Sequence, residues 1–391
     1  MIYLLTLAFW LSALLVVYPY LIYPPLLRLL ARLSPVRGEL QLAGGLPQVT
    51  LVISAYNEEA VITEKLRNAL DLDYPPDSLE VIVVSDASSD RTDEIVQEVS
   101  AREPRVRLVR LSERRGKSAG LNRAVDVAQG EIVVFSDANA LYEKRAVCEL
   151  VRGFADPQVG YVVGAALYYD AKGNRTAESE GLYWKLEMFL KHLESEYHSV
   201  VGGDGAIYAI RRHLFRELKD DDISDFVNPL QIIASGFRGR FNAKARCFEG
   251  SGETFGKEFK RKRRIVNRTW RAVSRYGGLL KLRDHGRFVF MLFSHKVIRW
   301  FTLPFVIVAW VANTALLGTS ILYILTWAAI TGSVVVAGVG AILDRLGLLQ
   351  PRLVSILYYF YLVSLAGLLG IWDEWRGVRH ATWDHIRKTE A

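Results

Sequence analysis

The chain alternates between long apolar runs and a central stretch of mixed apolar and polar residues. Residues 2–23 carry no charge, and about 20 apolar residues suffice to cross a bilayer core. Three more apolar runs follow later, at Phe301–Leu317, Ser320–Leu343 and Leu353–Trp372. A fourth full span would put the basic tail Arg376–Lys388 outside, against the positive-inside rule. We therefore predict three spans, with Leu353–Trp372 re-entrant or interfacial.

The central stretch has the pattern of an α/β domain. Four short apolar segments have the length and composition of buried strands: 49–54, 81–84, 106–111 and 132–135. The residues between them place apolar side chains at helical spacing, and Ser88 or Ser89 is expected to cap a helix over Thr92–Val99. Strand and helix alternating at this spacing predict a largely parallel sheet covered by helices.

Polar clusters stand where two of these strands end. Asp86 lies two residues after the strand at 81–84, and Asp137 lies two residues after the segment at 132–135. In open α/β sheets, ligands bind in the crevice at the carboxyl ends of the strands. Asp137 together with Asn139 offers oxygen ligands for Mg²⁺ or Mn²⁺, which substrate phosphates would complete.

Two common phosphate-binding patterns are absent from the sequence. No G-x-G-x-x-G follows the first strand, so the dinucleotide fingerprint is missing. Gly116-Lys117-Ser118 imitates the end of a Walker A loop, but the earlier glycine of that loop falls on Leu111. A metal is therefore the expected partner of the phosphate charge.

Basic residues indicate how the domain is oriented. The chain of 391 residues has a formal net charge of +7. Arginines follow the first apolar run at positions 28, 32 and 37, and residues 257–271 hold eight Lys or Arg and a single acid. The positive-inside rule places the central domain in the cytoplasm, at the cell (inner or plasma) membrane. The isolated Cys148 and Cys247 are expected to be packing residues in a reducing compartment.

These patterns divide the chain into five parts. We predict an N-terminal transmembrane helix and linker (1–46), a cytoplasmic catalytic domain (47–255), interfacial amphipathic helices (256–290), C-terminal transmembrane helices (291–375) and a cytoplasmic tail (376–391).

Four segments in this order and spacing resemble family 2 glycosyltransferases, in particular the membrane-embedded branch of cellulose, chitin and hyaluronan synthases. They are Ala-Tyr-Asn-Glu-Glu at 55–59, Ser-Asp-Ala-Ser-Ser-Asp at 85–90, Gly-Lys-Ser-Ala-Gly-Leu-Asn at 116–122 and Ser-Asp-Ala-Asn at 136–139. The resemblance covers residues 49–271 and implies a GT-A fold and a UDP-sugar donor.

The resemblance assigns donor contacts to the first three segments. It implies that Tyr56 and Glu58 line the nucleotide pocket, that Asp86 accepts a hydrogen bond from uracil, and that Lys117 faces the diphosphate. Two simpler interpretations remain: Asp86 as a helix cap or turn residue, and Lys117 as a solvated lysine at a helix start.

The fourth segment occupies the D-x-D position, whose members bind the metal. Asn139 replaces the second acid, and an amide oxygen ligates a hard cation without adding charge. We expect a weaker site that rests mainly on Asp137. The alternative is an enzyme that has lost activity.

Two later segments resemble the acceptor side of the same family. Residues 202–212 resemble the segment that closes the acceptor site, which puts Gly203 and Asp204 beside the acceptor, although the glycines could simply form a turn. Asp225 matches the general base, and Asp222 is its rival. The acidic run at 220–225 could also be a solvated loop. A single base suffices for direct inversion, with no covalent intermediate.

The basic segment at 260–265 lies where the polymer synthases carry Q-x-x-R-W. Arg261 and Arg264 match its first and fourth places and would bind the departing diphosphate. Lys260 and Lys262, turned away by the helical period, would face lipid head groups. Ile265 replaces the tryptophan, which disfavours processive synthesis.

The segments that flank the membrane complete the resemblance. Phe255–Arg287 is expected to form amphipathic interfacial helices, and Trp383 and Arg387 resemble a C-terminal gating element.

The leading interpretation is an inverting, metal-dependent glycosyltransferase that uses a UDP-sugar and a saccharide or polysaccharide acceptor, coupled to polymer export. One alternative acceptor is a polyprenyl phosphate or another lipid-linked molecule, used without processivity. Another is a catalytically silent subunit of a synthase complex, which Asn139 and Ser224 suggest. Membrane lipids are expected partners, whereas nucleic acid is not, because apolar runs closely follow the basic segment. The spans contain too few ionisable residues for a transporter.

Overall fold

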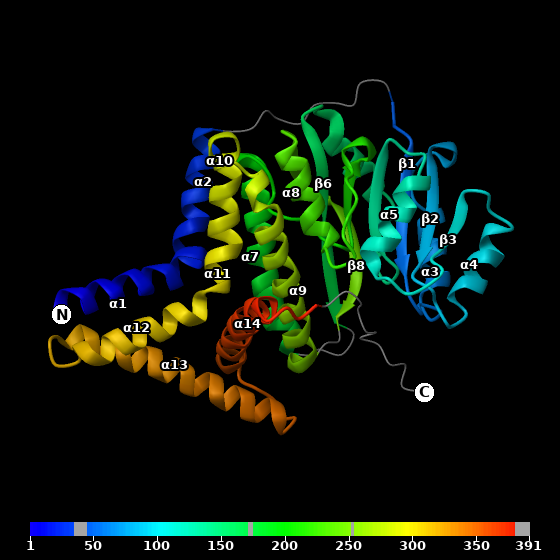
Figure 1. Cartoon of the computed structure of the whole chain (residues 1–391). Coiled ribbons are helices and arrows are strands. Elements are labelled where there is room, and N and C mark those ends of the chain that lie inside the picture. The colour runs from blue at the N-terminus through cyan, green and yellow to red at the C-terminus, as the bar shows by residue number, and fades with distance from the viewer. Residues whose placement is uncertain (35–44, 171–174, 252–253, 380–391) are drawn as a thin grey trace.

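The computed structural model describes residues 1–34, 45–170, 175–251 and 254–379. It has an α/β body and a helical body that lie side by side (Figure 1). From the helical body, α1 (Ile2–Val17) and α12 (Thr302–Leu316) project away from the sheet, and α13 (Ile321–Arg345) runs back toward α14 (Arg352–Trp375). Trp383 and Arg387 lie outside the described residues.

The α/β body is built on one eight-stranded sheet in the described residues. Its strands are β1 (Val49–Ala55), β2 (Leu79–Ser85), β3 (Val106–Arg110), β4 (Ile132–Asp137), β5 (Leu141–Tyr142), β6 (Val159–Asp170), β7 (Tyr208–Arg211) and β8 (Arg238–Ser251). Their order is β3-β2-β1-β4-β7-β6-β8-β5. The first four run parallel, as predicted. β7 is antiparallel to β4 and β6, and β5 is antiparallel to β8. The α/β class is confirmed, and the second half of the sheet is mixed.

Helices cover both faces of the sheet. One face carries α3 (Ile62–Leu70), α4 (Thr92–Ser100) and α6 (Ala146–Arg152), and the other carries α5 (Lys117–Val127), α7 (Arg175–Tyr197) and α8 (Ser224–Ala234). Successive residues of a strand point to opposite faces, so in β1 Leu51 and Ile53 join one core and Val52 joins the other. This two-sided burial explains why the predicted strands are almost wholly apolar.

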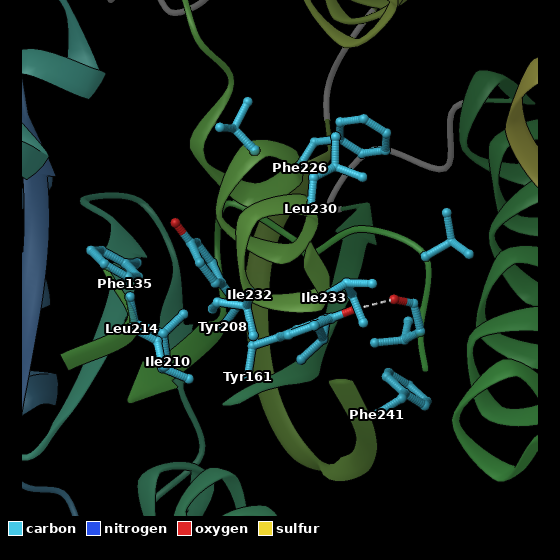
Figure 2. Packing of buried hydrophobic residues seen from close by; sticks show 14 of the residues in the cluster. Phe135, Tyr161, Tyr208, Ile210, Leu214, Phe226, Leu230, Ile232, Ile233 and Phe241 are labelled. Atoms are coloured by element: carbon cyan, nitrogen blue, oxygen red, sulfur yellow. Dashed lines mark hydrogen bonds between the residues drawn. The ribbon is translucent and has the colours of Figure 1, made fainter. Parts of the chain in front are cut away.

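The core beneath α8 is rich in aromatic residues (Figure 2). Phe135 of β4 and Tyr208 of β7 stack with their ring centroids 4.7 Å apart. Tyr161 of β6 donates its hydroxyl hydrogen to the carbonyl oxygen of Val200. Phe226 and Leu230 anchor α8 in the same cluster. Packing therefore fixes the first turn of α8 relative to the end of β4.

The remaining helices form the second body and its junction with the first. They are a π-turn η1 (Tyr18–Ile22), α2 (Tyr23–Leu33), α9 (Phe255–Tyr276), α10 (Leu282–Leu292), a π-turn η6 (Phe293–Val297), α11 (Ile298–Trp300) and α14 (Arg352–Trp375). Short 3₁₀ turns lie at η2 (Pro76–Ser78), η3 (Gly153–Ala155), η4 (Arg212–Leu214) and η5 (Gly277–Leu279). The π-turn η1 contains Pro19, where a ring in place of an amide donor disturbs a helix.

Within the described residues, three helices are long and apolar enough to cross a membrane: Ile2–Leu33, α13 and α14. A bent pair, Leu282–Trp300 and Thr302–Leu316, meets at 63° and would make a fourth span if it counts as one. The predicted number of three membrane spans agrees with the three single helices, but the segments that form them are not the three that were predicted. Leu353–Trp372 lies in the continuous helix α14, and Phe301–Leu317 forms the bent segment instead.

The predicted interfacial segment consists of α9, η5 and α10. α9 packs against α14, and its charged residues form ion pairs there. Arg263 donates to Asp373 at 2.6 Å, and Arg271 donates to Glu374 at 2.7 Å. Much of the basic charge that suggested a lipid surface is therefore used between helices.

Candidate active site

The strand register brings the predicted polar clusters to one edge of the sheet. Ser54 of β1 pairs with Asp137 of β4, and the next residue, Ala55, pairs with Ser85 of β2. Asp86 and Asp137 therefore lie on either side of the end of β1. This is the strand-end crevice in which α/β sheets bind ligands.

The two loops at the ends of β1 and β2 are tied together by Asn57. Its backbone amide donates to Ser88 Oγ at 3.1 Å, and its Oδ1 accepts from the backbone amide of Ser89 at 2.7 Å. The predicted capping of α4 by Ser88 or Ser89 is wrong, because Arg91 is at the N-cap position and the backbone amide of Thr92 donates to Asp90 Oδ1 at 3.0 Å. The serines are used to hold the crevice loops instead.

Tyr56 and Glu58 lie in the first of these loops, both half-buried. The guanidinium of Arg114 lies 4.0 Å from the ring centroid of Tyr56, in cation–π contact. The backbone amide of Glu58 donates to Thr92 Oγ1 at 2.7 Å. Arg114 was not a predicted site residue, and only the fold brings it to the tyrosine.

Asp86 holds the loop that precedes α5. Its carboxylate accepts hydrogen bonds from the backbone amides of Arg115, at 2.8 Å, and Gly116, at 2.9 Å and 3.0 Å. Gly116 has φ of +97°, in the region that favours glycine. Asp86 therefore positions the start of α5, where Lys117 is the first residue. Its contact with uracil stays a prediction.

Lys117, Asp137 and Asp225 converge on Gly205. A Cβ at Gly205 would lie 3.4 Å from Lys117 Nζ, 3.6 Å from Asp225 Oδ2 and 3.8 Å from Asp137 Oδ2. Lys117 Nζ forms an ion pair with Asp137 and lies 3.4 Å from the carbonyl oxygen of Gly205. The candidate base and the candidate metal ligand, distant in sequence, thus face one small space.

The charges in this space shift one another's pKa. Burial raises the pKa of Asp225, with Asp204 and Asp137 adding to the rise and Lys117 opposing it. Burial would lower the pKa of Lys117, but the carboxylate of Asp137 outweighs that effect and the pKa is raised. Lys117 therefore stays charged, and the pKa of Asp225 lies closer to neutral pH than that of an ordinary aspartate.

Glu249 of β8 is a further acid in this space that the sequence patterns did not single out. Burial, followed by the charges of Asp137 and Asp204, raises its pKa to about 8. β8 reaches the site only because it pairs with β6. No local motif marks Glu249, so the tertiary structure alone identifies it.

This crowding of acids fits a divalent cation. Carboxyl groups that raise one another's pKa are relieved by a cation between them. Asp137, the last residue of β4, and Asn139, in the loop that follows, are half-buried and supply oxygen ligands of the kind that Mg²⁺ and Mn²⁺ take. The described residues contain no cluster of three or more His, Cys, Asp or Glu side chains arranged to hold a metal. A cation bound here would take its other ligands from substrate phosphates and water.

Asp222 is anchored away from the reacting space. Its side chain is buried and accepts from Arg275 at 2.7 Å, from the Tyr276 hydroxyl at 2.7 Å and from the backbone amide of Lys219 at 3.0 Å. Asp221 is likewise paired with Arg275, at 2.9 Å. The interpretation of these two acids as a solvated loop is therefore wrong, and Asp225 is the member of the run that faces the site.

Arg268 of α9 also holds this run, and the sequence did not identify it. It is 9% exposed and donates to the carbonyl oxygens of Asp221, at 3.3 Å, and Asp222. Burial, with Arg264 nearby, lowers its pKa to about 10. Arg268 ties α9 to the turn that leads into α8 and Asp225.

The basic segment on α9 is only partly as predicted. Arg261 donates to buried Glu258 at 2.7 Å and 3.1 Å, and its charge opposes the rise in the pKa of Glu249. Arg264 is half-buried beside Arg268, and Lys260 is exposed. The prediction that Lys262 faces lipid is wrong. Its Nζ lies 3.4 Å from Glu258 and 4.7 Å from the ring centroid of Tyr183, inside the protein.

The predicted acceptor segment lies against the first turn of α8. A Cβ at Gly203 would come within 2.7 Å of the carbonyl oxygen of Asp225, so this backbone contact requires glycine. Asp204 Oδ2 lies 3.6 Å from Lys191 Nζ. Asp225 lines a cavity of about 180 Å³ that extends from here between α7, α9 and α14.

Known proteins resemble this chain in sequence and in fold. Residues 50–219 match the family described as glycosyl transferase family 2. The chain is 30% identical over 230 residues to the "Probable glycosyltransferase YdaM" of Bacillus subtilis, covering 54% of this chain and 52% of that protein. It is 29% identical over 182 residues to the "Beta-monoglucosyldiacylglycerol synthase" of Trichormus variabilis, covering 46% of this chain and 38% of that protein. The matches thus span about half or less of these relatives.

One solved structure matches nearly the whole chain. It is a mannosyltransferase from Pyrobaculum calidifontis in complex with GDP-Man and Mn²⁺, with 25% sequence identity and a TM-score of 0.67. The match covers 95% of this chain and 98% of that one. The likeness therefore includes the helices outside the sheet.

Proposed function

Residues 50–219 form a glycosyltransferase family 2 domain, and we propose that the whole chain is a membrane-bound, inverting glycosyltransferase. It moves a sugar from a nucleotide sugar to an acceptor hydroxyl. The observation that carries this proposal is the convergence of Lys117, Asp137 and Asp225 on Gly205. A transferase needs a base for the acceptor and positive charge for the leaving diphosphate in one place, and these residues provide both.

Asp225 acts as the general base. It takes the proton of the acceptor hydroxyl while that oxygen attacks the anomeric carbon, so the configuration inverts in one displacement without a covalent intermediate. Its raised pKa brings it nearer to the working pH, where a base is most effective. Gly203 and Gly205 keep the space in front of it free of side chains.

Lys117, with Arg261, stabilises the departing diphosphate. Lys117 Nζ is held between Asp137 and the backbone at Gly205, so it is oriented before substrate binds. Mg²⁺ or Mn²⁺, held by Asp137 and Asn139, would neutralise further phosphate charge when bound. The mannosyltransferase of similar fold was solved with Mn²⁺.

The sequence motifs of the first two loops favour a UDP-sugar as the donor, with Tyr56, Glu58 and Asp86 around its nucleotide base. The structural relative was solved with GDP-Man, so both nucleotides belong in a test. The acceptor is a saccharide or a lipid-linked molecule. The catalytic domain is placed on the cytoplasmic side of a multi-pass protein, according to the charge rule.

The test uses the full chain in lipid nanodiscs with a panel of UDP- and GDP-sugars, with Mn²⁺, with Mg²⁺ or with a chelator. We expect nucleotide release and labelled product from one donor, lost with the chelator. Donor binding without release under every condition would support the silent-subunit alternative. Absence of donor binding would overturn the proposal.

A further inference from the structure

The cavity beside Asp225 extends to the helices that carry the candidate membrane spans. Its walls come from α7, α8, α9, η6 and α11, and also from η1 and α14, both within candidate spans. A molecule in this cavity could thus contact Asp225 at one end and membrane helices at the other. A soluble saccharide acceptor would need no such wall.

The cavity wall holds an uneven group of charges around Glu187 of α7. Glu187 is buried, and both Lys296 and Arg299 pair with it, Arg299 Nη1 at 3.0 Å. His295 Nε2 lies 3.0 Å from Glu187 Oε1, and His295 Nδ1 lies 2.6 Å from Glu194 Oε1. Two permanent cations therefore pair with Glu187, while the second buried carboxylate, Glu194, contacts the cluster through His295.

The cavity wall as a whole has a surplus of positive charge, because its lining residues include four cations, Lys191, Lys262, Lys296 and Arg299, against two carboxylates, Glu187 and Asp225. Lys191 lies 3.6 Å from Asp204, and Lys262 lies 3.4 Å from Glu258. Arg299 also faces aromatic rings, 4.7 Å from the centroid of Tyr183. Buried positive charge in excess is costly unless an anion pairs with it, so the cavity is complementary to an anionic group.

We propose that this cavity binds the phosphate of a lipid-linked acceptor, with Lys296 and Arg299 as its phosphate-binding residues. This inference rests on the proposed function. Arginine and lysine are the usual partners of phosphate, and the walls from η1 and α14 give the lipid chain its side of entry. The acceptor hydroxyl faces Asp225. Its oxygen bonds to the anomeric carbon of the donor, the bond from that carbon to the nucleoside diphosphate breaks, and the proton passes to Asp225. The acceptor's phosphate takes no part in the bond changes.

The experiment compares matched acceptors with the full chain in phosphatidylcholine nanodiscs. The acceptors are an alkyl phosphoglycoside, the alkyl glycoside without phosphate, and a soluble hexose 1-phosphate. We expect transfer to the first to exceed transfer to the second by about tenfold or more, the effect of one charge-assisted contact. Preference for the soluble phosphate would identify a free phosphate as the ligand and would overturn the lipid source.

Variants of the cluster test its role. Arg299→Gln and Lys296→Gln should each raise KM for the phosphoglycoside about tenfold, with KM for the donor and the rate with the alkyl glycoside unchanged. Arg28→Gln is the matched control, because Arg28 lies 5.1 Å from the centroid of Phe189 of α7 and does not line the cavity. Equal losses with both acceptors would reduce Lys296 and Arg299 to a structural role.

Glu187→Gln gives a prediction of opposite sign. Removing the competing carboxylate frees both cations, so KM for the phosphoglycoside should fall, and this lipid should raise the melting temperature of the variant more than that of the wild type. A rise in KM would overturn the inference. Transfer to neutral acceptors alone, unaffected by any of these variants, would overturn it too while leaving the proposed function intact. Absence of donor binding would instead defeat the proposed function.

Discussion

At the scale of single residues, the site is a balance between one lysine and several acids. Lys117 is ion-paired with Asp137 and lies beside Asp225. Asp204 adds further negative charge around them, and Glu249, whose pKa is raised to about 8, is largely protonated at neutral pH. The protonation of Asp225 therefore depends mainly on its burial and, beyond that, on the charges of its neighbours.

This dependence predicts a pH profile. Because the pKa of Asp225 is raised and the ionised form is the base, kcat/KM should rise with pH through that raised pKa. Asp225→Asn should remove this acidic limb and lower kcat by about 10²-fold or more. Lys117→Met should move the limb to higher pH, because the charge that lowers the pKa of Asp225 is lost. The measurement is nucleotide release from pH 4 to 9.

The control for this profile is Asp222→Asn, since Asp222 is bound by Arg275 and Tyr276. That variant should lower the melting temperature but keep the limb. Loss of the limb in Asp222→Asn, with an unchanged limb in Asp225→Asn, would move the base to Asp222.

The proposed metal site leads to expected results for two further variants. Asp137→Ala should abolish turnover, because it alone brings charge to the D-x-D position. Asn139→Asp should keep or improve Mn²⁺ affinity, since it restores the second carboxylate. Titration of Mn²⁺ in the presence of UDP checks both. Full activity of Asp137→Ala in a chelator would show that no metal acts through this residue.

Among the elements, α9 connects the α/β body to α14, one of the helices long and apolar enough to cross a membrane. On one side it holds the turn before α8 through Arg268, and on the other it pairs with α14 through Arg263 and Arg271. α9 is therefore a structural link, and its basic composition reflects buried partners as well as a surface.

This role predicts how Arg268→Gln behaves. Carbonyl groups at Asp221 and Asp222 lose a buried donor, so the free energy of unfolding should fall by about 2 kcal/mol. We expect kcat to fall about tenfold, an effect of about 1.4 kcal/mol, with donor KM unchanged because α8 carries the base and not the donor site. Chemical denaturation and kinetics measure the two effects.

Arg283→Gln makes the same charge change on the exposed start of α10 and serves as the control. A loss of donor affinity in Arg268→Gln that matched its loss of kcat would contradict the positioning role.

At the scale of the whole molecule, the chain folds back on itself to complete the site. α2, near the N-terminus, packs against α7, and Tyr23 donates to Glu194 at 3.2 Å. The same Glu194 accepts from the backbone amide of Val201, at 2.9 Å, next to the acceptor segment. Tyr23 of α2 and His295 of η6 thus meet at Glu194, beside the predicted acceptor segment, whereas the loops after β1, β2 and β4 lie within the matched residues 50–219.

Those parts of the structure that depend on local pattern could be predicted from the sequence. The strands β1 to β4 agree with prediction to within about two residues, because buried parallel strands are short and almost wholly apolar. Asp86 and Asp137 could be placed at one edge, since parallel strands end on the same side. The apolar runs likewise marked the helices of the membrane part.

The contacts between groups that are distant in the sequence could not be predicted and follow from the three-dimensional fold. The contacts of Asp225 with Gly203 and Gly205, and the place of Glu249, depend on strand pairings and on a core that no local pattern encodes. An amphipathic pattern shows that one face of a helix is covered, but it does not say by what. For this reason the sequence predicts that Lys262 faces lipid, whereas in the structure its side chain contacts Glu258 and Tyr183 of α7. The surplus charge around Glu187 emerges for the same reason, because its members come from helices about 110 residues apart.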